Sequence, residues 1–324
     1  MKSTAIAPSN IAFIKYWGKK DETLRLPENG SISMCLSNMI TTTTVEFDEK
    51  YERDVFELVD TDDVNSDRVS AHLNLVRQMA RSRLRAKVIS KNSFPSGTGL
   101  SSSASGFAAL TVAAATAAGL LLSEKDLSIL ARQGSGSSCR SIPDGFVEWL
   151  DADTSDDSYA TSLFSPDYWD ITDVVAVVST GKKDVSTSEG QKLVGTSPFF
   201  DVRKSHMVEK VRKCKELIKK RDFTRFGELI EAEALELHAI MLTSSPSLIY
   251  WTPGTLEIMK QTKKWRSEGL EVYFTINTGQ DIHLIVRKKD IELLQKRLSD
   301  IDQVRDVIVN VPANGTRVVE EHLF

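Results

Sequence analysis

The feature that most constrains the fold is a Gly/Ser-rich segment, residues 95–106, which connects a strand-like stretch to an Ala-rich stretch. The Ala-Lys-Val-Ile-Ser run at 86–90 predicts a strand, and the apolar run at 107–122 predicts a buried helix. Glycines let the backbone approach a phosphate, and the free amides and dipole of a helix N-terminus favour an anion. No Lys follows in the GKS/T pattern, so this is not a Walker A loop. We predict a phosphate-binding loop, with a flexible linker that only caps the helix as the alternative; the candidate residues are Gly97, Gly99, Ser101, Ser102 and Ser103.

Nothing in the sequence predicts a membrane or nucleic-acid partner. The apolar run at 107–122 is shorter than the roughly 20 residues that span a bilayer, and Thr111, Thr116 and Gly119 interrupt it. Hydrophobic residues at 41% and charged residues at 27% are typical of a soluble globular protein. The formal net charge of -4 gives no general attraction to nucleic acid, and the first residues form no apolar signal segment. We therefore expect a cytoplasmic protein that binds anions through a local cluster of donors.

Strand patterns dominate the first 60 residues and helix patterns dominate the second half, which predicts an α+β protein. Ser123 and Asp126 form a capping-box-like pair at one helix start. We expect an N-terminal unit at residues 1–180 and a C-terminal unit at 181–324. The predicted strands are 31–36, 41–47, 86–90, 174–178, 272–276 and 282–286, and the predicted helices are 67–81, 107–122, 208–219, 256–265 and those that start at Ser123 and Asp222.

The cysteines and histidines predict no metal site. Cys35, Cys139 and Cys214 lack CxxC spacing, which favours buried or incidental thiols, and an intermolecular bridge through Cys214 stays open. The five histidines are dispersed without HxxxH spacing. His238 lies beside the apolar face of a predicted helix, and we expect it to have a packing or hydrogen-bonding role.

Three segments form a specific combination. Residues 7–19 read Ala-Pro-Ser-Asn-Ile-Ala-Phe-Ile-Lys-Tyr-Trp-Gly-Lys, and Asn-Ser-Phe-Pro at 92–95 leads into the Gly/Ser segment. Residues 135–141 read Ser-Gly-Ser-Ser-Cys-Arg-Ser and precede Gly-Phe-Val-Glu-Trp at 145–149. With these segments the chain resembles the GHMP kinase superfamily, and within it the mevalonate diphosphate decarboxylase family. Weaker likeness continues through 196–199, 222–239 and 273–281, so the resemblance spans nearly the whole chain.

The resemblance implies a GHMP-kinase fold, with a two-layer α/β N-terminal part and a helix-rich C-terminal part around a central cleft. It implies a lyase of isoprenoid (lipid) biosynthesis that uses ATP as co-substrate, with Mg²⁺ arriving on the nucleotide rather than in a protein metal site. In the family reaction, ATP phosphorylates the tertiary 3-hydroxyl of diphosphomevalonate with the help of an aspartate. The phosphate then leaves as the C–C bond breaks, which gives isopentenyl diphosphate, carbon dioxide, ADP and phosphate. The Gly/Ser segment would bind ATP, and a homodimer is the expected assembly.

The resemblance also implies roles for individual residues. Tyr16 and Lys19 would contact the terminal phosphates of the substrate, and Lys15 would lie near the reacting centre, where a lysine can polarise a hydroxyl or hold the catalytic carboxylate. Arg140 would hold the carboxylate that leaves as carbon dioxide, with Ser135 and Ser137 as further donors. The planar fork of an arginine suits that bidentate contact.

The turn at 276–281 departs from the family pattern. The family aspartate lies in a Phe-Asp-Ala-Gly-Pro-Asn-like turn, and a gapless reading places Asn277 at its position. An amide cannot take a proton as a carboxylate does. Asp281 is the only carboxylate in this turn, so we predict that Asp281 carries the catalytic role through a shifted loop. A turn-stabilising Asp281, and an Asn277 introduced into an otherwise normal enzyme, are the alternatives.

Other departures concern the substrate and leave several functions open. Glu28, Gly30, Gln191 and the Pro143-Asp144 pair replace residues that are usual in the family. These changes either retune the pocket for a monophosphorylated substrate or leave it unaffected. The alternatives are therefore a phosphomevalonate decarboxylase and a mevalonate 3-kinase that stops after phosphorylation. An inactive nucleotide-binding module is the alternative from another class.

Overall fold

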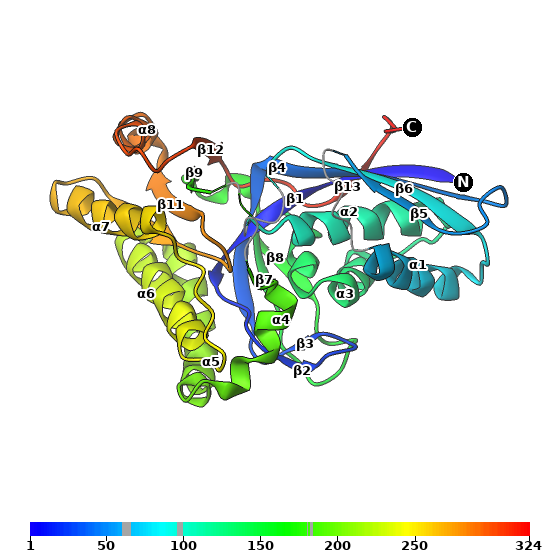
Figure 1. Cartoon of the computed structure of the whole chain (residues 1–324), viewed down its shortest axis with the longest axis horizontal. Helices are drawn as coiled ribbons and strands as arrows, with labels where there is room; N and C mark the ends of the chain where they lie inside the picture. Colours follow the sequence, from blue (N-terminus) through cyan, green and yellow to red (C-terminus); the bar gives the residue numbers. More distant parts are fainter. Residues whose placement is uncertain (60–65, 96–99, 180, 182–183) are drawn as a thin grey trace.

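The structure is a computed structural model, and it describes residues 1–59, 66–95, 100–179, 181 and 184–324. Its larger sheet has the strand order β13-β1-β4-β6-β5, and β7 pairs with both β4 and β8. The central pair is antiparallel along almost its full length (Figure 1). The bounds of these strands are β1 Lys2–Ile14, β4 Ser31–Asp48, β5 Val55–Leu58, β6 Arg85–Asn92, β7 Phe146–Trp149, β8 Ala160–Phe164 and β13 Arg317–Val319.

Strand β4 corrects one prediction from the sequence. The two strands expected at 31–36 and 41–47 are parts of this single strand, Ser31–Asp48. The polar interruption between them does not end the strand, because β1 pairs with both halves and shifts register between Pro8 and Asn10. Such an irregularity absorbs a local break in the side-chain pattern.

Three helices cover one face of this sheet (Figure 1): α1 Ser66–Ala80, α2 Ser102–Ala117 and α3 Glu124–Gly134. Helix α2 is the Ala-rich helix of the sequence, and it is buried on most of its sides between the sheet and its neighbours. Its small side chains allow this close approach. The capping box predicted at Ser123 and Asp126 is confirmed at the start of α3.

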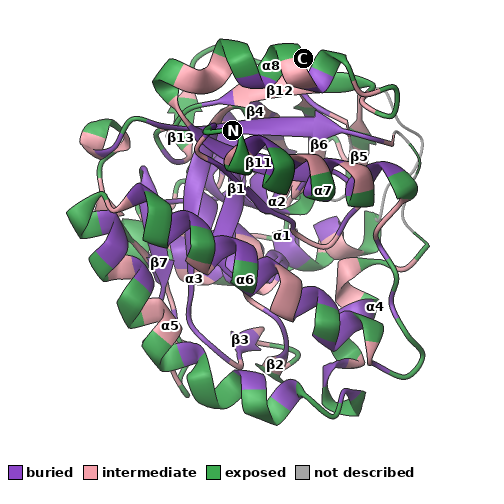
Figure 2. Ribbon diagram, turned by 90° about the vertical axis from the view of Figure 1, so that its left-hand side faces the viewer, coloured by how far each residue is buried: buried purple, intermediate pink, exposed green. Residues whose placement is uncertain are grey.

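A second, four-stranded sheet has the order β10-β11-β9-β12. Its strands are β9 Ile171–Val177, β10 Val272–Thr275, β11 Ile282–Arg287 and β12 Asp306–Asn310. The long helices α5 Phe200–Lys220 and α6 Phe223–Leu242 bury their inner faces, and their outer faces are exposed (Figure 2). Helix α7, Pro253–Ser267, packs on the four-stranded sheet through Ile258 and Trp265.

The chain crosses between its two halves more than once. Strand β9 precedes residue 180 but pairs with β11 and β12, and the C-terminal β13 returns to pair with β1. One hydrophobic core also joins the halves, and in it Phe13 of β1 meets Phe226 of α6 with ring centroids 4.8 Å apart. The division at residue 180 therefore stays a prediction.

Several elements escaped the sequence patterns because they are short. They include strands β7, β8, β12 and β13, the hairpin of β2 Lys19–Asp21 and β3 Leu26–Pro27, helix α4 Thr187–Lys192 and helix α8 Ile291–Ser299. All three cysteines are buried and free, which agrees with the expected buried thiols and leaves Cys214 inaccessible to a partner chain. Within the described ranges, no helix combines the length and apolar character needed to cross a membrane.

Candidate active site

A cavity of about 250 Å³ lies where several loops and helix ends meet. The end of β1, the N-terminus of α2, helix α4 and the β10–β11 turn all contribute to its walls. The short 3₁₀ helix Gly136–Ser141, which follows α3, forms a further wall. The cavity is lined by side chains that include Lys15, Tyr16, Arg25, Arg68, Ser101, Ser102, Ser103, Ser135, Ser137, Arg140, Gln191 and Asn277.

The charges of this cavity all have the same sign. Lys15, Arg25, Arg68 and Arg140 line it, and the described lining residues include no Asp or Glu. Such a cluster suits a ligand with several negative charges, because cations gathered in a confined space repel one another until an anion binds. The local cluster of donors expected from the sequence is therefore present.

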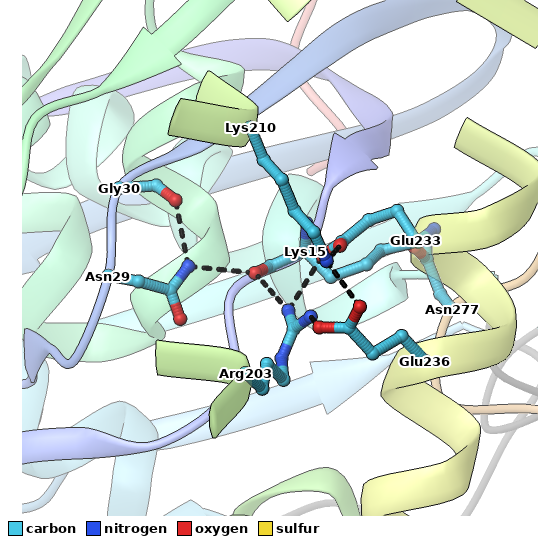
Figure 3. Close-up of polar contacts among 8 residues, drawn as sticks. All are labelled: Lys15, Asn29, Gly30, Arg203, Lys210, Glu233, Glu236 and Asn277. Atoms are coloured by element: carbon cyan, nitrogen blue, oxygen red, sulfur yellow. Dashed lines mark hydrogen bonds and ion pairs between the residues drawn. The ribbon is translucent and has the colours of Figure 1, made fainter. Parts of the chain in front are cut away.

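Lys15 is held at the end of β1 by a buried polar network (Figure 3). Its backbone N–H donates to Glu233 Oε1 at 3.1 Å, and its carbonyl accepts from Arg203 at 3.1 Å and Asn29 at 2.9 Å. Glu233 is itself fully buried, and it pairs with Arg203 at 2.6 Å and with Lys210 at 2.8 Å. A buried carboxylate that is paired twice in this way stays charged and rigid, so the network fixes the point from which the Lys15 side chain enters the cavity.

The Lys15 amine meets the turn between β10 and β11. Its Nζ donates to Asn277 Oδ1 at 3.0 Å, and Asn277 Nδ2 donates to Ser101 Oγ at 3.0 Å. His238 Nε2 lies 3.0 Å from the Asn277 carbonyl, and burial lowers the pKa of His238 to about 3, so this histidine is neutral. His238 thus has the hydrogen-bonding role expected from the sequence.

Burial lowers the pKa of Lys15 to about 7. Glu233 raises this pKa, and the cations Arg140 and Arg203 lower it further, but loss of hydration is the largest cause. A neutral amine has a lone pair that can accept a proton, whereas an ordinary exposed lysine is protonated at neutral pH. The site therefore holds a potential proton acceptor in a cavity whose described lining lacks a carboxylate.

Arg140 lies buried in the wall of the cavity. It is 3% exposed, and it donates to Ser31 Oγ at 2.9 Å and to Asn10 Oδ1 at 3.3 Å. Its Nε is buried and has no partner among the described residues, which leaves a donor for a ligand. Ser135 and Ser137 line the same wall, as the sequence suggested.

The N-terminus of α2 forms the facing wall. Ser101 precedes the helix in a left-handed conformation, with φ of 61°, and its hydroxyl reaches Asn277. Ser102 and Ser103 begin the first turn, where the backbone amides have no intrahelical partner. This arrangement suits the phosphates of a nucleotide, although Gly97 and Gly99 lie outside the described residues.

Two residues predicted for the site lie elsewhere. Lys19 is not among the cavity lining, and its Nζ pairs with Glu22 on the β2–β3 hairpin. Asp281 is 3% exposed, and its Oδ1 accepts from the backbone N–H of Val178 at 2.9 Å and of Ser179 at 3.4 Å. Asn277 lines the cavity and Asp281 does not, so the geometry favours a turn-holding role for Asp281.

The variant Asp281→Asn tests this role directly. Asparagine keeps an acceptor oxygen for both backbone amides but cannot accept a proton as a base. We expect near-normal turnover and a free energy of unfolding lowered by about 1 kcal/mol, because a neutral acceptor bonds more weakly than a charged one. Steady-state kinetics and thermal unfolding measure the two effects. A collapse of turnover with unchanged ATP affinity would instead support the catalytic role predicted from the sequence.

Sequence reasoning missed Arg25, Arg68, Arg203 and Glu233. These residues have no local signature, because each acts through contacts with distant segments. Arg68 belongs to an ordinary helical pattern, and Arg25 lies in a short stretch without periodicity, so neither residue gave a functional signal. Within the described part of the chain, no group of His, Cys, Asp or Glu residues could hold a metal ion.

Two family models together match most of the chain. The Diphosphomevalonate decarboxylase-like N-terminal domain matches residues 7–160, and the Mevalonate 5-diphosphate decarboxylase C-terminal domain matches residues 173–318. The diphosphomevalonate decarboxylase of Ganoderma lucidum is 32% identical, over 94% of this chain and 84% of its own length. The phosphomevalonate decarboxylase of Haloferax volcanii is 30% identical, over 95% of each chain.

A solved structure, MDDEF in complex with MVAPP, AMPPCP and magnesium, superposes with a TM-score of 0.93. It is 38% identical, and the match covers 99% of each chain. The expected α+β, GHMP-kinase fold is thereby confirmed, and so is the resemblance noted in the sequence. The chain belongs to the diphosphomevalonate decarboxylase family.

Proposed function

We propose that the chain catalyses the ATP-dependent decarboxylation of (R)-5-diphosphomevalonate to isopentenyl diphosphate, carbon dioxide, ADP and phosphate. The observation that carries this proposal is the meeting, in one cationic cavity, of a buried arginine, a buried lysine and a serine-rich helix N-terminus. These groups match the carboxylate, the hydroxyl and the nucleotide phosphates that the reaction brings together. The membership of the family supports the same reaction.

The first step transfers the γ-phosphoryl group of ATP to the 3-hydroxyl. Phosphoryl transfer depends mainly on positioning and on stabilisation of charge, which the α2 N-terminus and the cavity cations supply. Magnesium bound to the nucleotide would neutralise phosphate charge, and the Ser101 and Ser102 hydroxyls are the protein oxygens at hand. The hydroxyl proton passes to neutral Lys15, because Asn277 cannot accept it.

The second step breaks the C–C bond to the carboxylate. The electron pair of that bond forms the new C=C bond, the 3-phosphate leaves with its oxygen, and the carboxylate departs as carbon dioxide. Arg140, with Ser135 and Ser137, orients the carboxylate so that the breaking bond and the leaving phosphate stay aligned. Lys15, now protonated, lies close to the leaving phosphate and offsets its charge.

Arg140→Lys tests the carboxylate contact. An ammonium lacks the planar fork, so we expect kcat/KM for the phosphorylated mevalonate to fall about 10- to 100-fold, with the KM for ATP unchanged. Arg297→Lys is the matched control, since Arg297 pairs with Glu268 on the surface and does not line the cavity. Unchanged kinetics of Arg140→Lys would contradict the assignment.

Two observations support alternatives with the same site. The 30% identical relative from Haloferax volcanii is named a phosphomevalonate decarboxylase, so mevalonate 5-phosphate is the second candidate substrate. Asn277 faces the cavity where a carboxylate would assist the chemistry, which supports a 3-kinase as the alternative reaction.

One paired assay tests all of these functions. The chain is given ATP with either mevalonate 5-diphosphate or mevalonate 5-phosphate, and the release of ADP and carbon dioxide is followed together. Equal release of ADP and carbon dioxide is the expected result. The compound that gives the higher kcat/KM is the preferred substrate of the enzyme. ADP without carbon dioxide would instead mean a kinase, and ATP binding without either product would mean an inactive module.

The remaining expectations belong to this proposal. The composition and the family resemblance support a cytoplasmic homodimer, with units 1–180 and 181–324 on either side of the cavity. Sedimentation of the purified protein at several concentrations tests the assembly.

A further inference from the structure

The β2–β3 hairpin carries three cations with different partners. Lys19 pairs with Glu22 on the same hairpin, and Lys20 pairs with Asp153 at 2.9 Å. Neither of these two lysines lines the cavity. Arg25 does line it, so it is the hairpin cation that the described structure presents to a ligand.

The backbone of Arg25 is held in an unfavourable conformation. Its φ is 53°, in the left-handed region that residues with a side chain rarely adopt. The described non-glycine residues with positive φ also include Ser101, which lines the same cavity at the start of α2. Such conformations persist where the surrounding structure enforces them, and they concentrate at ligand sites.

The Arg25 side chain is anchored at one end and available at the other. Its Nε donates to the carbonyl of Gln133 at 3.0 Å, at the C-terminal end of α3, where a cation is favoured by the helix dipole. Arg68 donates to the next carbonyl, that of Gly134, at 3.0 Å. Among the described residues, the two terminal nitrogens of Arg25 have no hydrogen-bond partner, and no Asp or Glu forms an ion pair with the Arg25 side chain.

The neighbours of Arg25 place it in the substrate half of the cavity. The Tyr16 ring packs against Gly136, where an added Cβ would come within 2.8 Å of the ring and hydroxyl. Tyr16 and Arg25 both line the cavity; burial raises the pKa of Tyr16, and the positive charge of Arg25 opposes this rise. Tyr16, Arg25 and Arg68 thus gather around residues 133–136, and Arg140 follows four residues later.

We propose that Arg25 binds the phosphate chain on C5 of the substrate and serves as the hairpin cation for that contact in place of Lys19. The fork of terminal nitrogens left by the Gln133 anchor suits two oxygens of one phosphate. The left-handed backbone aims this fork, so that little conformational entropy is lost on binding. The inference rests on the proposed function, because it takes the phosphorylated mevalonate as the ligand.

The test compares three single substitutions on one hairpin: Arg25→Gln, Lys19→Gln and Lys20→Gln. Binding of mevalonate 5-diphosphate, mevalonate 5-phosphate, unphosphorylated mevalonate and ATP is measured by calorimetry, without turnover. We expect Arg25→Gln to weaken the phosphorylated mevalonates about 10- to 100-fold and to leave mevalonate and ATP unchanged. Lys20→Gln, which removes the same charge outside the cavity, should bind all four ligands as the wild type does. Arg25→Lys should restore part of the lost affinity.

Several results would overturn the inference. Arg25→Gln could bind the phosphorylated mevalonates normally, could weaken mevalonate equally, or could weaken ATP instead. Thermal unfolding confirms that each variant is folded, and a larger loss with Lys19→Gln than with Arg25→Gln would return the role to Lys19. Failure of the wild-type chain to bind any phosphorylated mevalonate would overturn the proposed function itself, which separates the two failures.

Discussion

Lys15→Met is expected to lower the rate of decarboxylation by about 10²- to 10⁴-fold, the range that general acid–base catalysis contributes. Methionine has a similar length but no lone pair on nitrogen, so the 3-hydroxyl loses its proton acceptor. It also fits the buried environment, because it removes the cost of burying an amine that is only 2% exposed. Thermal unfolding should therefore show a variant at least as stable as the wild type, and steady-state kinetics measure the loss of rate.

The pH dependence gives the sharper form of this prediction. Lys15 accepts a proton only when neutral, so kcat/KM of the wild type should rise with pH through about 7, the pKa of the buried amine. Below that pH the amine is protonated and the rate falls. The rising limb should vanish in Lys15→Met. Lys15→Arg distinguishes a base from a simple cation, because an arginine keeps the positive charge but cannot lose its proton to become a base. Recovery of the rate in Lys15→Arg, or an unchanged rising limb in Lys15→Met, would contradict the role of Lys15 as a base.

Asn277→Asp is expected to raise turnover by about 10-fold at pH 6, because only about a tenth of the Lys15 amine is neutral one pH unit below its pKa of about 7. The new carboxylate would lie at the position of Asn277 Oδ1, 3.0 Å from Lys15 Nζ. A negative charge at that distance raises the pKa of the lysine and keeps the pKa of the carboxyl low. The carboxylate then acts as the base below pH 7, where Lys15 of the wild type is already protonated. The gain should be largest at low pH, and the rising limb of kcat/KM should move to lower pH.

Two further variants test whether the gain in turnover comes from a carboxylate at position 277. Asn277→Ala removes the contacts to Lys15 and Ser101 and should lower the rate, which shows that the position matters to the chemistry. The double variant Asn277→Asp with Asp281→Asn should match Asn277→Asp alone, because Asp281 lies outside the cavity lining. A fall in turnover of Asn277→Asp would mean that the chemistry requires the amide as it stands, paired with a neutral lysine.

Most of the fold could be predicted from the sequence because its elements are encoded locally. The capping box at Ser123 and Asp126 and the apolar periodicity of α6 depend on residues three or four positions apart, and both appear as expected. Short elements such as α4 and the β2–β3 hairpin have too few residues for a pattern. The single long strand β4 could not be foreseen, because its continuity depends on pairing with β1 and not on its own sequence.

The sequence by itself determined the family, the Ala-rich helix α2, and the presence of Lys15, Tyr16 and Arg140 near one another. Only the tertiary structure decided that Asn277 faces Lys15 while Asp281 holds the backbone at Val178 and Ser179. The two side chains are four residues apart in one turn, and the direction in which each points is set by the segments packed against that turn. The lowered pKa of Lys15 and the placement of Arg25 have the same origin. Arg203, whose charge lowers the pKa of Lys15, lies 188 residues from it, and Gln133 lies 108 residues from Arg25. Burial and charge at such sites are sums over distant neighbours, which a local pattern does not encode.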